Sequence, residues 1–121
     1  MKILGICCSP RRHGNSEMLL EEALASAKEA GAEVEFITLS GKDIRFCDGC
    51  DACQKTHKCH IHDDMQPLYA RMQEADGIIF SAPVYMWSVC AQAKTMMDRT
   101  YALGHGGLRN KVGGAILVAG R

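Results

Sequence analysis

Apolar residues form four short runs along the chain, separated by longer amphipathic or polar stretches. Residues 2–7, 77–82 and 112–119 are almost continuously apolar, a pattern typical of strands covered on both faces of a parallel sheet. Residues 33–39 instead alternate apolar with charged side chains, which predicts a strand at an edge of that sheet.

Helical spacing of apolar residues predicts helices between these strands, over residues 15–30, 64–74 and 91–103. Asn15 is the expected N-cap of the first helix, and its acidic residues, Glu17 among them, are expected to face away from the core. The side chains expected to face the core are Leu19, Leu20, Ala23, Leu24 and Ala27 in the first helix and Ala93, Met96, Met97 and Tyr101 in the third.

Strands that alternate with helices indicate an α/β fold, with right-handed crossovers and an open parallel sheet between two helical layers (α/β/α). The buried first strand and the edge-like second strand favour the strand order 2-1-3-4. We expect one domain over residues 1–121. Such sheets usually continue to a fifth strand, so residues 112–119 would form an exposed apolar edge. We therefore expect a C-terminally truncated chain or a fragment that oligomerises.

Charge and hydropathy exclude two classes of partner. Fourteen Lys and Arg balance fourteen Asp and Glu, so bulk charge gives no reason to expect nucleic-acid binding. No apolar run approaches the roughly 18 residues needed to cross a bilayer. The apolar start of the chain is too short for a signal peptide, and we expect a cytoplasmic location with no membrane partner.

Cysteines are the strongest chemical signal. Of seven cysteines, Cys47, Cys50, Cys53 and Cys59 fall within residues 47–59, which we call the cysteine loop. Three thiolates at two-residue spacing, closed by a fourth a few residues later, favour a [4Fe–4S] cluster. Zinc, with a histidine replacing one thiolate, and free or disulfide-bonded thiols remain alternatives. The nearby histidines, which we expect to be solvated loop residues, are His57, His60 and His62.

A polar loop, residues 9–16, leads from the first strand into the first helix; we call it the phosphate loop. Free backbone N–H groups and the positive end of a helix dipole favour a phosphate there. No Gly-Lys-Ser/Thr or Gly-x-Gly-x-x-Gly motif is present, which favours a single terminal phosphate over a pyrophosphate. The alternative is a capped helix with a solvated basic turn. The residues expected to matter are Ser9, Asn15 and Ser16 as donors, Arg11 or Arg12 as the charge, and Gly14 for a tight turn.

A second loop, residues 82–89, follows the third strand at the same carboxyl edge of the sheet, where open α/β sheets bind ligands; we call it the ring loop. Its Tyr85, Met86 and Trp87 suit a planar ring. The alternative is a hydrophobic loop packed on the next helix. Together the two loops indicate a phosphate tail plus a flat ring, which describes FMN. Outside the cysteine loop, we expect Cys7 in the core and Cys8 and Cys90 near the ring seat.

These motifs resemble a known family. Cys-Ser-Pro-Arg-Arg-His-Gly-Asn-Ser at residues 8–16, the four-cysteine run at 47–59 and Ala-Pro-Val-Tyr-Met-Trp-Ser at 82–88 are similar to an iron–sulfur flavoprotein of the NADPH-dependent FMN reductase family, which has a flavodoxin-like fold. Members commonly continue well past residue 121.

The resemblance implies FMN and a [4Fe–4S] cluster on Cys47, Cys50, Cys53 and Cys59. It also implies a homodimer or homotetramer, in which the flavin and cluster of different chains approach each other, and electron exchange with a ferredoxin-like carrier. The implied FMN-binding residues are Ser9, Arg11, Gly14, Asn15 and Ser16 at the phosphate and Pro83, Val84, Tyr85, Met86, Trp87 and Ser88 along the ring.

Three functions follow from these features. The first is a redox iron–sulfur flavoprotein that transfers electrons between a one-electron carrier and FMN or a downstream acceptor. The second is a cluster-free NAD(P)H-dependent FMN or quinone reductase. The third is a non-enzymatic metal-binding remnant that has lost its flavin.

Overall fold

The computed structural model describes residues 1–120. Its parallel sheet consists of β1 (Lys2–Cys7), β2 (Glu33–Thr38), β3 (Gly77–Tyr85) and β5 (Val112–Val118). The strands lie in the order β2-β1-β3-β5, which confirms the predicted order because β5 is the fourth strand expected from the sequence. The additional two-residue β4 (Ser88–Val89) pairs antiparallel with the end of β3 and was not predicted.

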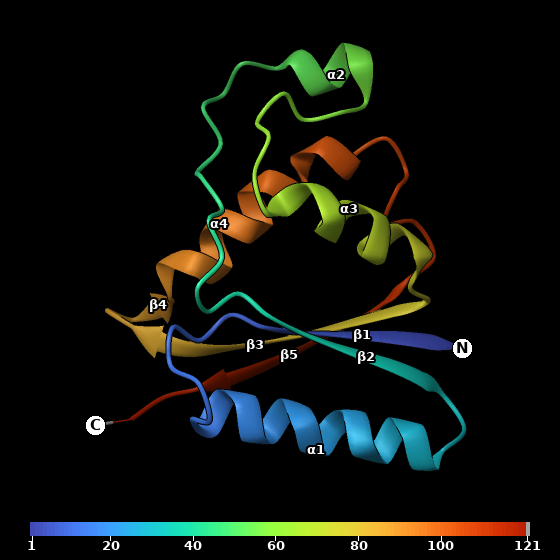
Figure 1. Cartoon of the computed structure of the whole chain (residues 1–121), viewed down its shortest axis with the longest axis vertical. Helices are drawn as coiled ribbons and strands as arrows, with labels where there is room; N and C mark the ends of the chain where they lie inside the picture. The colour runs from blue at the N-terminus through green and yellow to red at the C-terminus, as the bar shows by residue number, and fades with distance from the viewer. Residues whose placement is uncertain (121) are drawn as a thin grey trace.

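Helices cover both faces of this sheet, which confirms the three layers (Figure 1). The long helix α1 (Asn15–Glu29) covers one face, and α3 (Met65–Glu74) and α4 (Ala91–Arg99) cover the other. A 3₁₀ turn, η1 (Thr100–Leu103), completes the segment predicted as one helix over 91–103. The cysteine loop, with the short helix α2 (Ala52–Thr56), lies beyond the end of α4, on the side away from the sheet (Figure 1).

The apolar core is split between the two faces of the sheet. Ile3 and Cys7 of β1 pack with Leu20 and Leu24 of α1. Leu4 and Ile6 point the other way, because successive side chains of a strand face opposite sides. Gly5 allows α1 to approach β1 closely, since a Cβ there would lie 2.6 Å from a methyl carbon of Leu24. The opposite cluster is formed mainly by Met65, Leu68, Met72, Ala93 and Met96.

Three side-chain orientations differ from the predictions. Leu19 is exposed, whereas Glu17 is buried because its carboxylate caps the phosphate loop. Tyr101 is half exposed, and it lies in the 3₁₀ turn η1 and not in α4. Gly14, not Asn15, is the N-cap of α1, and Asn15 is its first helical residue.

The strand β5 forms the exposed apolar edge that the sequence predicts. In residues 1–120 it pairs only with β3, and its Val112 and Leu117 are 66% and 53% exposed. None of the helices described here is both long and apolar enough to span a bilayer.

Candidate functional site

The phosphate loop and the ring loop meet at one small cavity of about 220 Å³, which we call the loop pocket. Eight of the eleven residues expected to contact FMN line it. The lining residues are Ser9, Arg11, Gly14, Asn15 and Ser16 from the phosphate loop, Pro83, Val84 and Tyr85 from β3, Val118 at the end of β5, and Ala119 and Gly120 after it. The last three are not among the eleven residues expected to contact FMN, although their position at the carboxyl end of a parallel strand is a usable signal.

The remaining three candidates, Met86, Trp87 and Ser88, do not line the loop pocket. Met86 and Trp87 form the two-residue turn between β3 and β4, and they are 88% and 96% exposed. Both have positive φ, +47° and +67°, in a hairpin position that usually holds Asn-Gly. The left-handed backbone conformation costs a residue with a side chain about 1 kcal/mol or more. The pairing of Tyr85 with Ser88 offsets this cost and closes the turn.

A buried carboxylate shapes the phosphate loop. Glu17 is 1% exposed and accepts hydrogen bonds from Arg12 Nε (3.1 Å) and from the backbone N–H of His13 (3.0 Å). The hydrogen bond from Arg12 lowers the pKa of Glu17 in spite of the carboxyl's burial. His13, with φ +57°, makes the turn predicted for Gly14, whose φ of −92° is ordinary.

The Arg12–Glu17 pair also decides which arginine faces the loop pocket. Arg12 is engaged with Glu17, whereas Arg11 lines the cavity. The N–H of Arg11 donates to Ser9 Oγ at 3.1 Å, which fixes the start of the loop. Of the two arginines left open by the sequence, Arg11 is therefore the one available to an anion.

Cys8 and Cys90 lie in the core, so neither reaches a ligand at the surface. They are 0% and 2% exposed, and Cys90 Sγ lies 3.2 Å from the carbonyl oxygen of Cys8. Burial raises the pKa of the Cys8 thiol to about 12, so it is a neutral core group. The two cysteines do lie beside the ring loop, since the backbone N–H of Cys90 donates to the carbonyl oxygen of Pro83 at 3.1 Å, but their thiols point into the core. Cys7 is buried as predicted.

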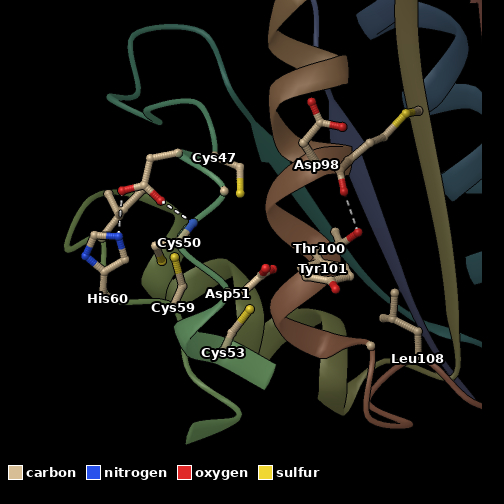
Figure 2. A pocket seen from close by; sticks show the side chains of 15 residues that line it. Cys47, Cys50, Asp51, Cys53, Cys59, His60, Asp98, Thr100, Tyr101 and Leu108 are labelled. Carbon is tan, nitrogen blue, oxygen red and sulfur yellow. Dashed lines mark hydrogen bonds and ion pairs between the residues drawn. The ribbon is translucent and has the colours of Figure 1, made fainter. Parts of the chain in front are cut away.

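All four cysteines of the cysteine loop line a second, larger cavity of about 660 Å³, which we call the cysteine cavity (Figure 2). All four are free thiols. The loop turns sharply at Gly49, Asp51 and His57, which have positive φ and flank or bound α2. Across the cavity from the thiols lies a wall formed by Met97, Asp98, Thr100, Tyr101, Gly104 and Leu108.

The thiols of the cysteine loop share one electrostatic environment. Burial raises the pKa of the Cys53 thiol, and repulsion from Cys59, Cys50 and Cys47 raises it further. The sulfurs are nevertheless spread out: within residues 1–120, no three of them lie within 4.8 Å of one another. A tetrahedral zinc ion with bonds of about 2.3 Å would hold its sulfurs closer than about 4 Å. The loop is therefore wider than a preformed four-cysteine zinc site.

The histidines near the cysteines have separate contacts. His60 Nε2 lies 2.8 Å from Asp48 Oδ2, and Asp48 also accepts the backbone N–H of Cys50. Asp48, Cys50 and His60 form the one set of three ligand atoms within 4.8 Å among the described residues. The His57 ring meets His105 edge to face at 4.0 Å, and His62 is exposed.

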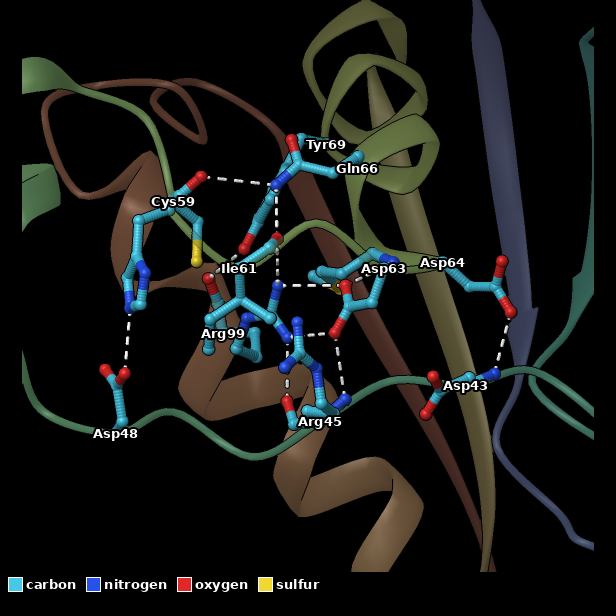
Figure 3. Close-up of polar contacts among 12 residues, drawn as sticks. Asp43, Arg45, Asp48, Cys59, Ile61, Asp63, Asp64, Gln66, Tyr69 and Arg99 are labelled. Atoms are coloured by element: carbon cyan, nitrogen blue, oxygen red, sulfur yellow. Dashed lines mark hydrogen bonds and ion pairs between the residues drawn. The ribbon is translucent and has the colours of Figure 1, made fainter.

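A buried ion pair that sequence reasoning missed lies behind the cysteine cavity (Figure 3). Arg99 at the end of α4 donates to both carboxylate oxygens of Asp63, at 2.6 and 3.0 Å, and their side chains are 0% and 1% exposed. Burial alone would raise the pKa of Asp63, but hydrogen bonds from Arg99 and from the N–H groups of Arg45 and Met65 lower it to about 2. No local sequence pattern marks this pair.

This depressed pKa predicts an acid-sensitive contribution to stability. The pKa of Asp63 is about 2 in the fold against an ordinary 3.8, so the ionised form contributes about 2 kcal/mol above pH 5. That contribution decreases as the pH falls from 4 towards 2. Asp63→Asn should lower the free energy of unfolding by about this amount at pH 6, and the difference should shrink to a small fraction as the pH falls to about 2. Urea unfolding at stepped pH measures it, with Glu29→Gln as the exposed control; a difference independent of pH contradicts it.

Comparison with known proteins identifies the chain's relatives. The model of the NADPH-dependent FMN reductase family matches residues 1–121. The chain belongs to this family. Among curated proteins, an iron-sulfur flavoprotein of Methanocaldococcus jannaschii is 49% identical to this family member over 98% of the present chain. An iron-sulfur flavoprotein of Methanosarcina thermophila is 43% identical over 99% of the present chain. The present chain covers 62% and 64% of them, so it spans about three fifths of their length.

Solved structures confirm the flavodoxin-like fold of this family member. A flavone reductase superposes with a TM-score of 0.76 at 30% identity, covering 99% of this chain and 44% of that one. RosB, with the bound intermediate 8-demethyl-8-formylriboflavin-5'-phosphate, superposes with a TM-score of 0.80 at 18% identity, covering 100% and 53%. At this low identity, the similarity to RosB shows only a common fold.

The two cavities of this family member are lined by elements at opposite ends of α4, whose course Figure 1 shows. The helix begins beside β4 and the ring loop, and it ends at Arg99, next to the cysteine cavity. A nine-residue helix is roughly 13 Å long. Among residues 1–120, none lines both cavities.

Proposed function

We propose that this chain holds FMN in the loop pocket and a [4Fe–4S] cluster on Cys47, Cys50, Cys53 and Cys59. Its role is to pass electrons between a one-electron carrier of the ferredoxin type and FMN or a downstream acceptor. The observation that carries this proposal is the convergence of four free thiols on one cavity of about 660 Å³. The names of the curated relatives support it.

The cysteine loop suits a cluster better than a single ion. A cubane binds each thiolate at a different corner, so its ligands stand farther apart than those of one tetrahedral ion. The sulfurs here are spread in this way around a common space. The wall across that space includes Met97, Tyr101 and Leu108, whose apolar surface limits access of water to the cluster.

The loop pocket suits the phosphate end of FMN. Its volume of about 220 Å³ is below the roughly 300 Å³ at which whole-ligand pockets begin, so it fits the phosphate and the adjoining chain. The first N–H groups of α1 and the side chain of Arg11 bind the phosphate. The ring then lies along Tyr85 and the exposed Met86, Trp87 and Ser88, where a planar ligand covers apolar surface.

The separation of the cavities favours electron transfer between chains. When bound, the cluster supplies one-electron steps and FMN accepts electrons singly or in pairs. Within one chain, α4 stands between the two sites. We therefore propose a homodimer or homotetramer in which the ring loop of one chain faces the cysteine cavity of another, and in which the open edge of β5 is covered.

One observation favours a second function. The ligand atoms of Asp48, Cys50 and His60 already lie close enough for a zinc-type ion. With such an ion in place of the cluster, the loop pocket would serve a cluster-free NAD(P)H-dependent FMN or quinone reductase.

An anaerobic preparation distinguishes these functions. We expect the reconstituted protein to contain iron, sulfide and FMN, to absorb visible light from both groups, and to give an electron-paramagnetic-resonance signal of a reduced cluster after dithionite. Zinc without sulfide, together with flavin that NADPH bleaches rapidly, supports the reductase. A protein that contains metal but binds no flavin, even after FMN is added, supports a metal-binding role without enzymatic activity.

A further inference from the structure

Both ends of the cysteine loop are fastened to one side chain, that of Arg99. Before the loop, the carbonyl oxygen of Arg45 accepts a hydrogen bond from Arg99 Nη1 at 2.7 Å. After the loop, the carbonyl oxygen of Ile61 accepts one from Arg99 Nη2 at 3.4 Å. The guanidinium therefore closes the base of the loop on the last turn of α4.

Asp63 completes this fastening. Its two carboxylate oxygens accept from Arg99 and also from the backbone N–H groups of Arg45 (2.9 Å) and Met65 (3.0 Å). One buried ion pair thus joins the start of the loop, its end, the first residue of α3 and the end of α4 (Figure 3). Removing one partner of such a pair leaves an uncompensated buried charge, which is strongly destabilising.

The pair lies directly behind the cysteine cavity. Ile61, Asp98 and Thr100, which contact or adjoin Arg99, line that cavity. Tyr69 of α3 donates its hydroxyl hydrogen to the carbonyl oxygen of Arg99 at 3.0 Å. The Ile61 carbonyl that Arg99 binds also accepts from Gln66 Nε2 at 2.6 Å, and Gln66 Nε2 donates to the carbonyl oxygen of Cys59 at 3.2 Å. The positive charge of Arg99 is therefore linked to Cys59 through Ile61 and Gln66.

We propose that Arg99 is a positioning residue for the cluster site: it holds the two ends of the cysteine loop together, and its positive charge stabilises the reduced cluster. This inference rests on the cluster proposed above. Fixing the loop ends lowers the entropy lost when four thiolates gather around the cluster. A one-electron reduction adds negative charge to the cluster, so a fixed cation behind Cys59 raises the reduction potential.

The first experiment measures the loop without any cluster. In apoprotein, Arg99→Gln and Arg99→Lys should both increase backbone hydrogen exchange over residues 45–63, because neither side chain can bind two carbonyls and a carboxylate as the guanidinium does. Exchange in β1 and α1 should stay unchanged. Lys94→Gln, which removes an exposed ion pair on the same helix, is the control. Unaltered exchange over 45–63 in both Arg99 variants overturns the positioning role.

The second experiment separates charge from geometry in the loaded protein. Arg99→Gln removes a positive charge and should lower the potential of the cluster, whereas Asp63→Asn removes a negative charge and should raise it. Both variants break the ion pair that closes the base of the loop, so a purely structural role predicts shifts of the same sign. Arg99→Lys keeps the charge and should keep the wild-type potential while losing its cluster to a chelator at least tenfold faster. Equal potentials in all variants overturn the electrostatic part.

FMN binding at the far end of α4 reports whether each variant has folded. A variant that binds FMN like the wild type but loses its cluster faster supports the inference. If Arg99→Gln fails to fold, Arg99→Lys carries the test through hydrogen exchange and chelator kinetics. If the wild-type protein takes up no iron or sulfide, the proposed function is wrong. The hydrogen-exchange result in apoprotein then still decides whether Arg99 positions the loop.

Discussion

Replacing Cys53 with serine should remove the cluster almost completely. Iron and sulfide per chain should fall to about a tenth or less of the wild-type values, because a serine hydroxyl is a far weaker ligand for iron than a thiolate. Cys53 is the one cluster candidate on α2, and burial, with repulsion from the three other cysteines, raises the pKa of its half-buried thiol. Chemical assays of iron and sulfide after anaerobic reconstitution measure the loss.

The matched control is Gln54→Ser, which places serine at the next, exposed position of the same short helix. It should keep full iron and sulfide. Both variants should bind FMN as the wild type does, because the loop pocket shares no residue with the cysteine cavity. A Cys53→Ser protein with wild-type iron and sulfide would show that this thiol is not a ligand. Equal losses in both variants would show that the loop tolerates no change.

The sheet could be predicted because its signals are local. A strand buried on both faces is nearly all apolar, and an edge strand alternates, so β1 and β2 are distinguishable from residue type alone. The same holds for the cysteine loop, where the spacing of Cys47, Cys50 and Cys53 already brings the thiols to one cavity. Parallel topology then brought the phosphate loop and Pro83 to one pocket without any further information.

The features that could not be predicted depend on partners far apart in the sequence. Glu17 has the spacing of an outward-facing residue, and only its contact with Arg12 and the loop backbone explains its burial. Arg99 resembles any helix C-terminal arginine, because its partner Asp63 is 36 residues away. The position of the cysteine loop depends on this pair, so the sequence could not reveal that it lies at the far end of α4.

Arg11→Gln should weaken FMN binding by about ten- to a hundredfold. A hydrogen bond to a charged group contributes about 1.5–3 kcal/mol, and Arg11 is the arginine that lines the loop pocket, whereas Arg12 is paired with Glu17. Quenching of flavin fluorescence on titration into apoprotein measures the affinity. Because the interaction is with the phosphate, the same substitution should leave the weaker binding of riboflavin unchanged.

The comparison of the two flavins separates phosphate recognition from a general distortion of the loop. Arg109→Gln, the same substitution at an exposed arginine outside the loop pocket, should change neither affinity. The advantage of wild type over Arg11→Gln should also shrink as salt is raised from 0.05 to 0.5 M, since screening weakens a partly exposed charge pair. Equal losses for FMN and riboflavin would place the role of Arg11 in the shape of the loop, and no loss for either would move the phosphate site away from the start of α1.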